Sequence, residues 1–221
     1  MSELQFSPLL YEIINTDDSD FFLDGREHRR KYQACKKAFE RFQELRGQVV
    51  SQAIAIEKEL DRAIAWYFVP RLRHKRDQFQ QEEDDRRNKL IDLVLGQESF
   101  MISSKVKAMA SIIEGMEIQS IAPNAFRQKF EAIVEIRNQL AHRRVGIDWL
   151  TQKAALWDAK KRRWGFPVFD ERGNKKEKKW NDRIPDKLDN FYSGLCKVAN
   201  TDIDKLWRET LKLRVMDNAE Y

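Results

Sequence analysis

Cysteine and histidine are scarce in this sequence, and they are not clustered. The 221 residues include 2 cysteines and 3 histidines, and Cys35 and Cys196 lie far apart and match no metal-ligand spacing. A structural zinc site needs several such side chains at short spacings, and a disulfide framework needs paired cysteines in an oxidising compartment. The sequence therefore predicts no metal site and no cofactor, and it indicates a reducing compartment.

Glycine and proline are also scarce, with 8 and 5 residues, whereas charged residues make up 35% of the chain. Sheets of short strands joined by tight turns need many such residues, so this composition favours long amphipathic helices. Apolar residues amount to 42%. That share is enough to build a hydrophobic core, and it argues against global disorder.

Long apolar runs and secretion signals are missing as well. The first twenty residues carry no basic segment before their short apolar run, and acidic residues follow it directly. This pattern does not fit a signal peptide, and no apolar run is long enough to cross a bilayer. We expect a cytoplasmic protein without a membrane partner.

Several catalytic motifs are absent. The sequence has no glycine-rich phosphate loop, no HExxH, no CxxC pair and no GxSxG. ATP-driven, zinc-hydrolase and serine-hydrolase functions therefore lack support. The net charge of +5 and the pI of about 9.1 suit an anionic partner, but they do not identify it.

Most of the chain shows the apolar spacing of amphipathic helices. Apolar side chains recur at steps of three and four, with breaks at Gly47, Pro70 and Gly96. We interpret residues 71–88 as an exposed charged insertion, because they lack a clear apolar face, and their charge pairs could make it helical. Glu98-Ser99 is a plausible N-cap. The predicted helices cover residues 26–46, 48–69, 89–95, 98–118, 123–146 and 186–214.

Residues 153–183 differ in character from the rest of the chain. They contain 11 Lys and Arg and 5 Asp and Glu, interleaved with tryptophans, and residues 171–174 have the composition of a hairpin turn. Two interpretations stay open: either the hairpin binds a phosphate backbone and stacks bases, or it is a solvated element whose aromatic side chains pack on the bundle. Under the first interpretation, the predicted RNA-binding residues are Arg143, Arg144, Lys160, Lys161, Arg162 and Arg163.

Together these patterns predict an all-α fold. We expect one domain, residues 1–221, formed by a helical bundle of about five main helices with a small β-hairpin before the C-terminal helix. The core helices would occupy about residues 48–145, the basic aromatic hairpin about 153–183, and the C-terminal helix about 186–214.

One segment carries recognisable chemistry: residues 136–142 are Ile-Arg-Asn-Gln-Leu-Ala-His. This segment resembles the signature of the HEPN superfamily, which is an Arg, a polar residue directly after it, and a His a few positions later on a late core helix. Ser99-Phe100, Lys105 and the Glu-rich stretch 56–60 also resemble members of that family, over roughly residues 48–145. The resemblance implies a HEPN-like bundle and a metal-independent endoribonuclease of the toxin, abortive-infection or antiviral kind.

The chemistry of these residues also follows from physical argument. On a helix, Asn138 and His142 are four residues apart and share a face, so Asn138 can orient the imidazole. Arg137 falls in an apolar series and must be paired or border a cleft, with Glu57 or Asp61 as candidate partners. A neutral His can accept the 2′-OH proton of RNA while an Arg binds the scissile phosphate, without any metal. The predicted catalytic residues are Arg137, Asn138 and His142.

A single motif histidine leaves one part of this reaction unassigned, because cleavage also needs an acid for the leaving oxygen. A two-fold dimer supplies it by bringing two copies of Arg137 and His142 to one cleft. The family resemblance implies the same arrangement. RNA and a second copy of the chain are thus the predicted partners, and the resemblance also admits an antitoxin or regulatory protein.

Other functions compete with this one. A non-catalytic HEPN module would bind RNA, nucleotide or a partner protein, but the intact Arg137 and His142 favour the enzyme. A helical scaffold protein would have no affinity for nucleic acid. His142 also has an alternative explanation without a catalytic role, because the helix dipole favours a histidine near a helix C-terminus.

Overall fold

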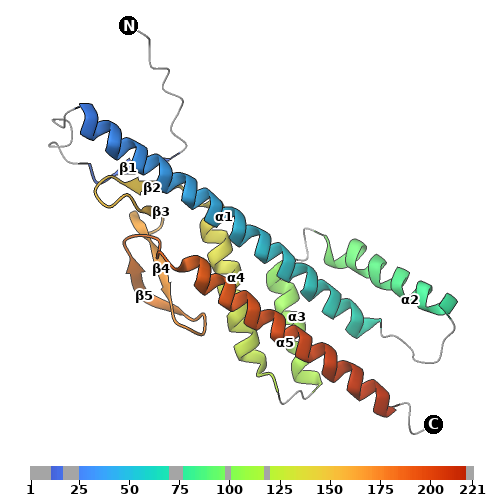
Figure 1. The fold of residues 1–221 in the computed structure, drawn as a ribbon. Helices are drawn as coiled ribbons and strands as arrows, with labels where there is room; N and C mark the ends of the chain where they lie inside the picture. The colour runs from blue at the N-terminus through green and yellow to red at the C-terminus, as the bar shows by residue number, and fades with distance from the viewer. Residues whose placement is uncertain (1–10, 17–24, 70–76, 98–100, 117–119, 218–221) are drawn as a thin grey trace. The chain divides into compact units, whose positions relative to one another are not determined.

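The computed structural model describes residues 11–16, 25–69, 77–97, 101–116 and 120–217 (Figure 1). Within these ranges the helices are α1 (Gly25–Phe68), α2 (Asp77–Leu90), the short π-helix η2 (Ile91–Leu95), α3 (Ile102–Gly115), α4 (Pro123–His142) and α5 (Leu188–Asp217). The strands are β1 (Glu12–Ile14), β2 (Val145–Asp148), β3 (Ala154–Asp158), β4 (Arg163–Phe169) and β5 (Lys175–Asn181).

The fold is α/β, and the all-α prediction is wrong. The described strands form one five-stranded mixed sheet in the order β1-β2-β3-β4-β5. β1 runs parallel to β2, and every other neighbouring pair is antiparallel. The predicted turn at residues 171–174 is confirmed, since it joins β4 to β5 (Figure 1). The hairpin is therefore one edge of a larger sheet.

The additional strands begin where α4 ends. The helix predicted over 123–146 stops at His142, and residues 145–148 form β2. Val145 and Ile147 are β-branched and buried, which favours a strand over a helix. The pairing of Ile13 with Ile147 brings β1 from the far end of the chain. Local periodicity cannot reveal a pairing between such distant segments.

A buried carboxylate holds this part of the sheet together. Asp148, only 1% exposed, accepts a hydrogen bond of 2.6 Å from Asn15 Nδ2 and is also bonded by Arg183. It accepts further bonds from the backbone N–H groups of Leu150 (2.9 Å) and Thr151 (2.7 Å). A buried charge is tolerated only when it is paired and hydrogen-bonded in this way. Asp148 thus fixes the β1 end, the β2–β3 turn and the segment after β5.

The N-terminal helices predicted over 26–46 and 48–69 form one continuous helix, α1, of 44 residues. Gly47 is exposed, and nothing lies within 4 Å of the position that a Cβ would take. The apolar stripe runs straight past it, because Phe42, Val49 and Ile56 recur every two turns and are all buried. A glycine lowers helix propensity by only about 1 kcal/mol, so the stripe prevails.

The insertion predicted over residues 71–88 is helical in the part that the structure describes, but it is not exposed throughout. α2 covers Asp77–Leu90, and Arg87 is buried on it. The guanidinium of Arg87 lies 3.8 Å from the ring centroid of Trp66, and its Nε donates to the carbonyl of Val69 at 2.8 Å. The N-cap predicted at Glu98-Ser99 lies outside the described residues.

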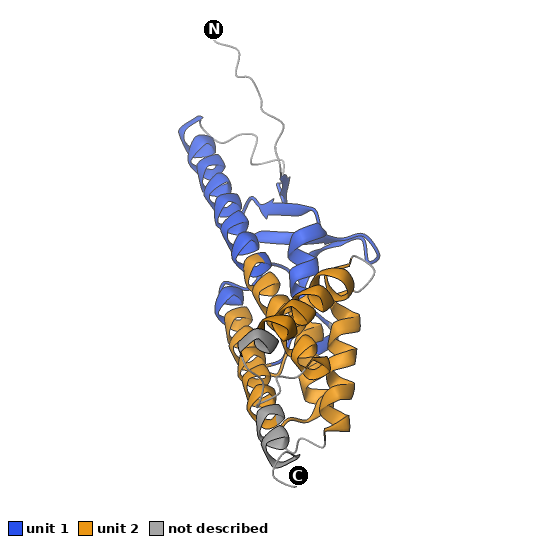
Figure 2. Ribbon diagram, turned by 90° about the vertical axis from the view of Figure 1, so that its right-hand side faces the viewer, with its two compact units in different colours: residues 1–50, 136–170, 175–190 blue, residues 51–135, 171–174, 191–221 orange. Residues whose placement is uncertain are grey.

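The chain divides into two compact units (Figure 2). Unit 1 comprises Met1–Val50, Ile136–Asp170 and Lys175–Asn190, and it holds the sheet, the N-terminal part of α1 and the end of α4. Unit 2 comprises Ser51–Glu135, Glu171–Asn174 and Phe191–Tyr221.

Each unit contains deeply buried apolar side chains of its own. In unit 1 these include Cys35, Leu140, Ile147, Leu156 and Phe166, and in unit 2 they include Ile56, Leu60, Phe126, Phe130 and Tyr192. Among the described residues, no helix combines the length and apolar character that crossing a membrane requires.

Candidate functional site

The last turns of α4 carry the three predicted catalytic residues, and all three belong to unit 1. His142 is the last residue of the helix, and both it and Asn138 are exposed, while Arg137 is half-buried. Nη1 of Arg137 donates to Oδ1 of Asn138 at 2.8 Å. Asn138 therefore orients the guanidinium. The imidazole of His142 has no hydrogen bond or ion pair with any described residue.

The acids proposed as partners of Arg137 bind a different cation. Nζ of Lys105, which is 3% exposed, lies 2.8 Å from Oε1 of Glu57 and 2.9 Å from Oδ1 of Asp61. Burial raises the pKa of Asp61, and Lys105 acts against that rise. Burial alone would lower the pKa of Lys105, but its hydrogen bonds to the two carboxylates outweigh this, and the pKa is raised. The predicted pairing of Arg137 with Glu57 or Asp61 is wrong.

The backbone at the end of α4 is fixed by a side chain of α1. Nη2 of Arg46 donates to the carbonyl of Ala141 at 2.5 Å. The last carbonyls of a helix have no partner within the helix and carry partial negative charge, so a guanidinium there satisfies one of them. This contact holds the turn that presents His142, and sequence reasoning did not identify Arg46.

The two arginines after His142 diverge. Arg144 is exposed and pairs with Glu12 of β1, with Nη2 and Oε2 2.5 Å apart. Arg143 lies on the side of Asp158, with Nη1 and Oδ2 3.7 Å apart, and its guanidinium is 5.7 Å from the ring centroid of Trp180.

Two further cations from the β3–β4 turn and β4 reach the same indole. Nζ of Lys161 and the guanidinium carbon of Arg163 each lie 4.6 Å from the ring centroid of Trp180. These distances are within the range of cation–π attraction. We call Trp180, Arg143, Lys161 and Arg163 the Trp180 cluster. Of the six predicted RNA-binding residues, the structure gathers Arg143, Lys161 and Arg163 around Trp180.

Asp158 builds the turn that presents these cations. Its Oδ1 accepts hydrogen bonds from the backbone N–H groups of Lys160 (3.0 Å) and Lys161 (3.2 Å). Arg162 takes a left-handed conformation with φ of 48° and completes the turn. An Asp that bonds to the backbone two residues later is a recognised turn signal, so the sequence did contain a sign of this role.

Trp157 and Trp164 lie apart from the Trp180 cluster. They are cross-strand partners with ring centroids 5.2 Å apart, and strand alternation places them on the face opposite to Asp158 and Arg163. A Cβ at Gly146 would lie 2.8 Å from Cζ3 of Trp164, so that indole rests directly on the β2 backbone. These contacts favour the packing interpretation for both residues.

Comparisons with protein-family models, with curated proteins and with solved structures found no match to this chain. Functional assignment therefore rests on the geometry of unit 1 and on the resemblance of residues 136–142. In the part of the chain that the structure describes, no group of three or more His, Cys, Asp and Glu side chains is placed to hold a metal ion.

The end of α4 and the residues after it carry three features of unit 1. These are a half-buried arginine bonded by a neighbouring amide, an exposed imidazole at the helix end, and a cationic indole cluster that includes the next residue. Such a set can bind phosphate oxygens and can move a proton near neutral pH.

Proposed function

We propose that this chain is a metal-independent endoribonuclease that acts as a homodimer, of the toxin or antiviral (abortive-infection) kind. The observation that supports it most is the pair of Arg137 and His142 at the end of α4, with the guanidinium oriented by Asn138. The resemblance to the HEPN signature lies in these same residues. When the 2′-OH of RNA attacks the neighbouring phosphate, cleavage needs a group that binds the phosphate and a group that transfers the proton, and these two residues can do both.

The reaction follows from the two side chains. His142 accepts the proton of the 2′-OH, and the 2′-oxygen attacks the phosphorus while Arg137 stabilises the charge on the phosphate oxygens. The bond from phosphorus to the 5′-oxygen breaks. The products carry a 2′,3′-cyclic phosphate and a 5′-hydroxyl, with the leaving oxygen taking a proton from an acid.

A second copy of the chain supplies that acid. In a two-fold dimer, one protomer's His142 acts as base while the same residue of its partner, protonated, donates to the leaving oxygen. Since the imidazole of His142 is exposed in the single chain, it is accessible to a second copy.

The role of Asn138 differs from the one expected from helix periodicity. Its Oδ1 accepts from Arg137, so Asn138 is a positioning residue for the phosphate-binding arginine. Replacing Asn138 by Ala should therefore slow RNA cleavage without abolishing it. Replacing Arg137 by Ala should abolish cleavage, and Arg137→Lys should restore only part of it, because a lysine cannot bind phosphate through two N–H groups.

The test is incubation of the purified protein with total RNA and transfer RNA in the presence of EDTA. Cleavage that persists under chelation and leaves cyclic phosphate ends supports the proposal. Inhibition by EDTA, or full activity of Arg137→Ala, contradicts the mechanism.

The alternative is a non-catalytic module that binds RNA, nucleotide or a partner protein. One observation favours it: no described residue holds the imidazole of His142 in one tautomer, as a third group commonly does in catalytic sites. This alternative predicts RNA binding without any cleavage product, in EDTA or with added divalent metal.

A further inference from the structure

The Trp180 cluster gathers three positive charges at one place. Arg143 comes from the end of α4, Lys161 from the β3–β4 turn and Arg163 from β4, and all three lie within 6 Å of one ring centroid. Like charges brought this close repel each other, and the ring offsets only part of that cost. A site that assembles them from three segments is therefore suited to an anion.

Among the described residues, one carboxylate faces these cations, that of Asp158, and it neutralises them only in part. Oδ1 of the buried Asp158 is occupied by two backbone N–H groups of its own turn. Oδ2 lies 3.7 Å from Nη1 of Arg143, which is beyond hydrogen-bond distance, and that nitrogen has no hydrogen-bond partner among the described residues. That nitrogen is buried, so it is not the donor that a ligand would meet. Lys161 and Arg163 are exposed and form no ion pair with a carboxylate in the part of the chain that the structure describes, so their N–H groups are the donors that a phosphate group can complement.

The indole is not available to stack a base. Lys161 and Arg163 cover it at 4.6 Å, and a Cβ at Gly165 would lie 3.4 Å from its Cε3 atom, so the ring also rests against the sheet. Base recognition by stacking needs an open aromatic face. In this structure Trp180 instead holds the cations in place.

We infer that the Trp180 cluster is a phosphate-binding site for the backbone of a single-stranded nucleic acid, independent of base sequence. Arg143 directly follows His142 in the chain, so the cluster includes a residue adjacent to the histidine of the proposed active site. That the strand is then cut rests on the proposed function, whereas the binding of phosphate does not. Because phosphate is common to RNA and DNA, the cluster should bind both, although only RNA has the 2′-OH that the cleavage needs.

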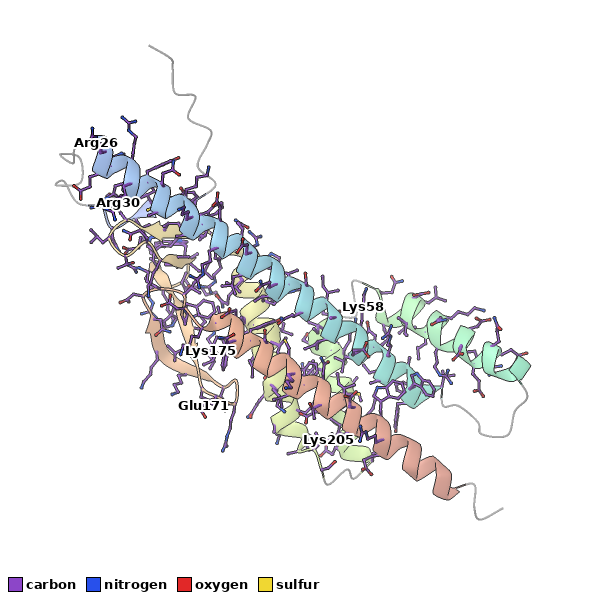
Figure 3. The ribbon with its side chains drawn as sticks, in the orientation of Figure 1. Arg26, Arg30, Lys58, Glu171, Lys175 and Lys205 are labelled. Atoms are coloured by element: carbon purple, nitrogen blue, oxygen red, sulfur yellow. The ribbon has the colours of Figure 1, made fainter. Side chains whose placement is uncertain are left out.

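The decisive experiment measures fluorescence anisotropy of labelled single-stranded RNA and of DNA of the same sequence over a series of salt concentrations. The test variant is Lys161→Gln with Arg163→Gln, both of which are exposed in the structure. The control removes two lysines of unit 2 that are also exposed, Lys58→Gln with Lys205→Gln (Figure 3). Both variants lose the same net charge, so they differ only in where the charge is lost.

The test variant should flatten the slope of log affinity against log salt by about 1.4, because each phosphate contact on a single strand contributes about 0.7. The loss should be the same for RNA and for DNA, and the control should keep the wild-type slope. An unchanged slope in the test variant, or an equal loss in the control, overturns the inference. Circular dichroism confirms that both variants fold.

The outcome is separable from that of the ribonuclease proposal. If the test variant loses affinity for DNA while the wild type cleaves no RNA, the phosphate site stands and the catalytic proposal falls. If the wild type cleaves RNA while the test variant keeps its affinity for DNA, the catalytic proposal stands and the phosphate site falls.

Discussion

The buried ion cluster of unit 2 gives a prediction whose size follows from the structure. Lys105 donates to Glu57 and Asp61, and its side chain is 3% exposed. Lys105→Met keeps most of the volume of the stem but removes the charge. Glu57 is 28% exposed and can be solvated in the variant, whereas Asp61, at 10%, cannot. The variant therefore retains one uncompensated buried carboxylate.

The magnitude is set by that carboxylate. Removing one partner of a buried ion pair typically costs about 3–5 kcal/mol, and we expect about 3 kcal/mol because only one of the two acids stays buried. Lys107 provides a matched control, since it lies on the same helix, α3, but is exposed. Lys107→Met should change the free energy of unfolding by less than about 0.5 kcal/mol.

The loss should also depend on pH, with a defined sign. Burial raises the pKa of Asp61, and the lysine acts against that rise, so the variant should raise it further. A carboxyl whose pKa is raised by folding binds its proton more tightly in the folded state, so it destabilises the protein as pH rises through that pKa. The difference between the variant and the wild type should therefore shrink on acidification from pH 7 to about pH 5.

Urea unfolding followed by far-UV circular dichroism at both pH values measures this directly. Equal stabilities of Lys105→Met and Lys107→Met at pH 7 would refute the reasoning. So would a penalty that grows on acidification.

Three further predictions concern unit 1 and the assembly. Gly146→Ala should lower the free energy of unfolding, measured by thermal unfolding, by about 1–3 kcal/mol, because its Cβ would meet Trp164. Gly194→Ala has open space on helix α5 and should be neutral or slightly stabilising. Equal effects of the two substitutions would contradict the packing described. Asp158→Asn keeps an oxygen acceptor for the turn but removes the carboxylate that faces Arg143. It should raise the affinity for a single strand by about two- to fivefold, which corresponds to a binding free energy of about 0.5–1 kcal/mol. Weaker binding would argue against an anion site. Sedimentation at micromolar concentration should show a dimer, and a monomer that still cleaves RNA would exclude the composite site.

Local sequence patterns predicted the helices well and the sheet poorly. The stripe of Phe42, Val49 and Ile56 and the Pro123 start of α4 are visible as helical spacing, and the structure places helices there. β1 and β2 are too short to show alternation, and their pairing of Ile13 with Ile147 depends on contacts between distant segments. The amino-acid composition and the apolar spacing therefore favoured helices, and they did not predict the additional strands that make the fold α/β.

The residues of the candidate site can be named from the sequence, whereas the contacts between them could not be predicted from it. The order of Arg137, Asn138 and His142 is visible in the sequence, whereas the hydrogen bond from Arg137 to Asn138 needs side-chain positions. Of six basic residues chosen from composition, three gather on Trp180, because strand register decides which side chains share a face. The pairing of Lys105 with Glu57 and Asp61 went unnoticed, since a lysine within a helical pattern usually faces solvent.

The central claim is that His142 transfers the proton of the 2′-OH. The most direct measurement compares cleavage of a single-stranded RNA in EDTA by the wild type, by His142→Ala and by His28→Ala, whose exposed histidine lies elsewhere in unit 1, on α1. We predict that the wild type and His28→Ala produce fragments with cyclic phosphate ends, that His142→Ala produces none, and that DNA of the same sequence is left intact. Cleavage by His142→Ala at the wild-type rate, or cleavage of the DNA, would contradict the account.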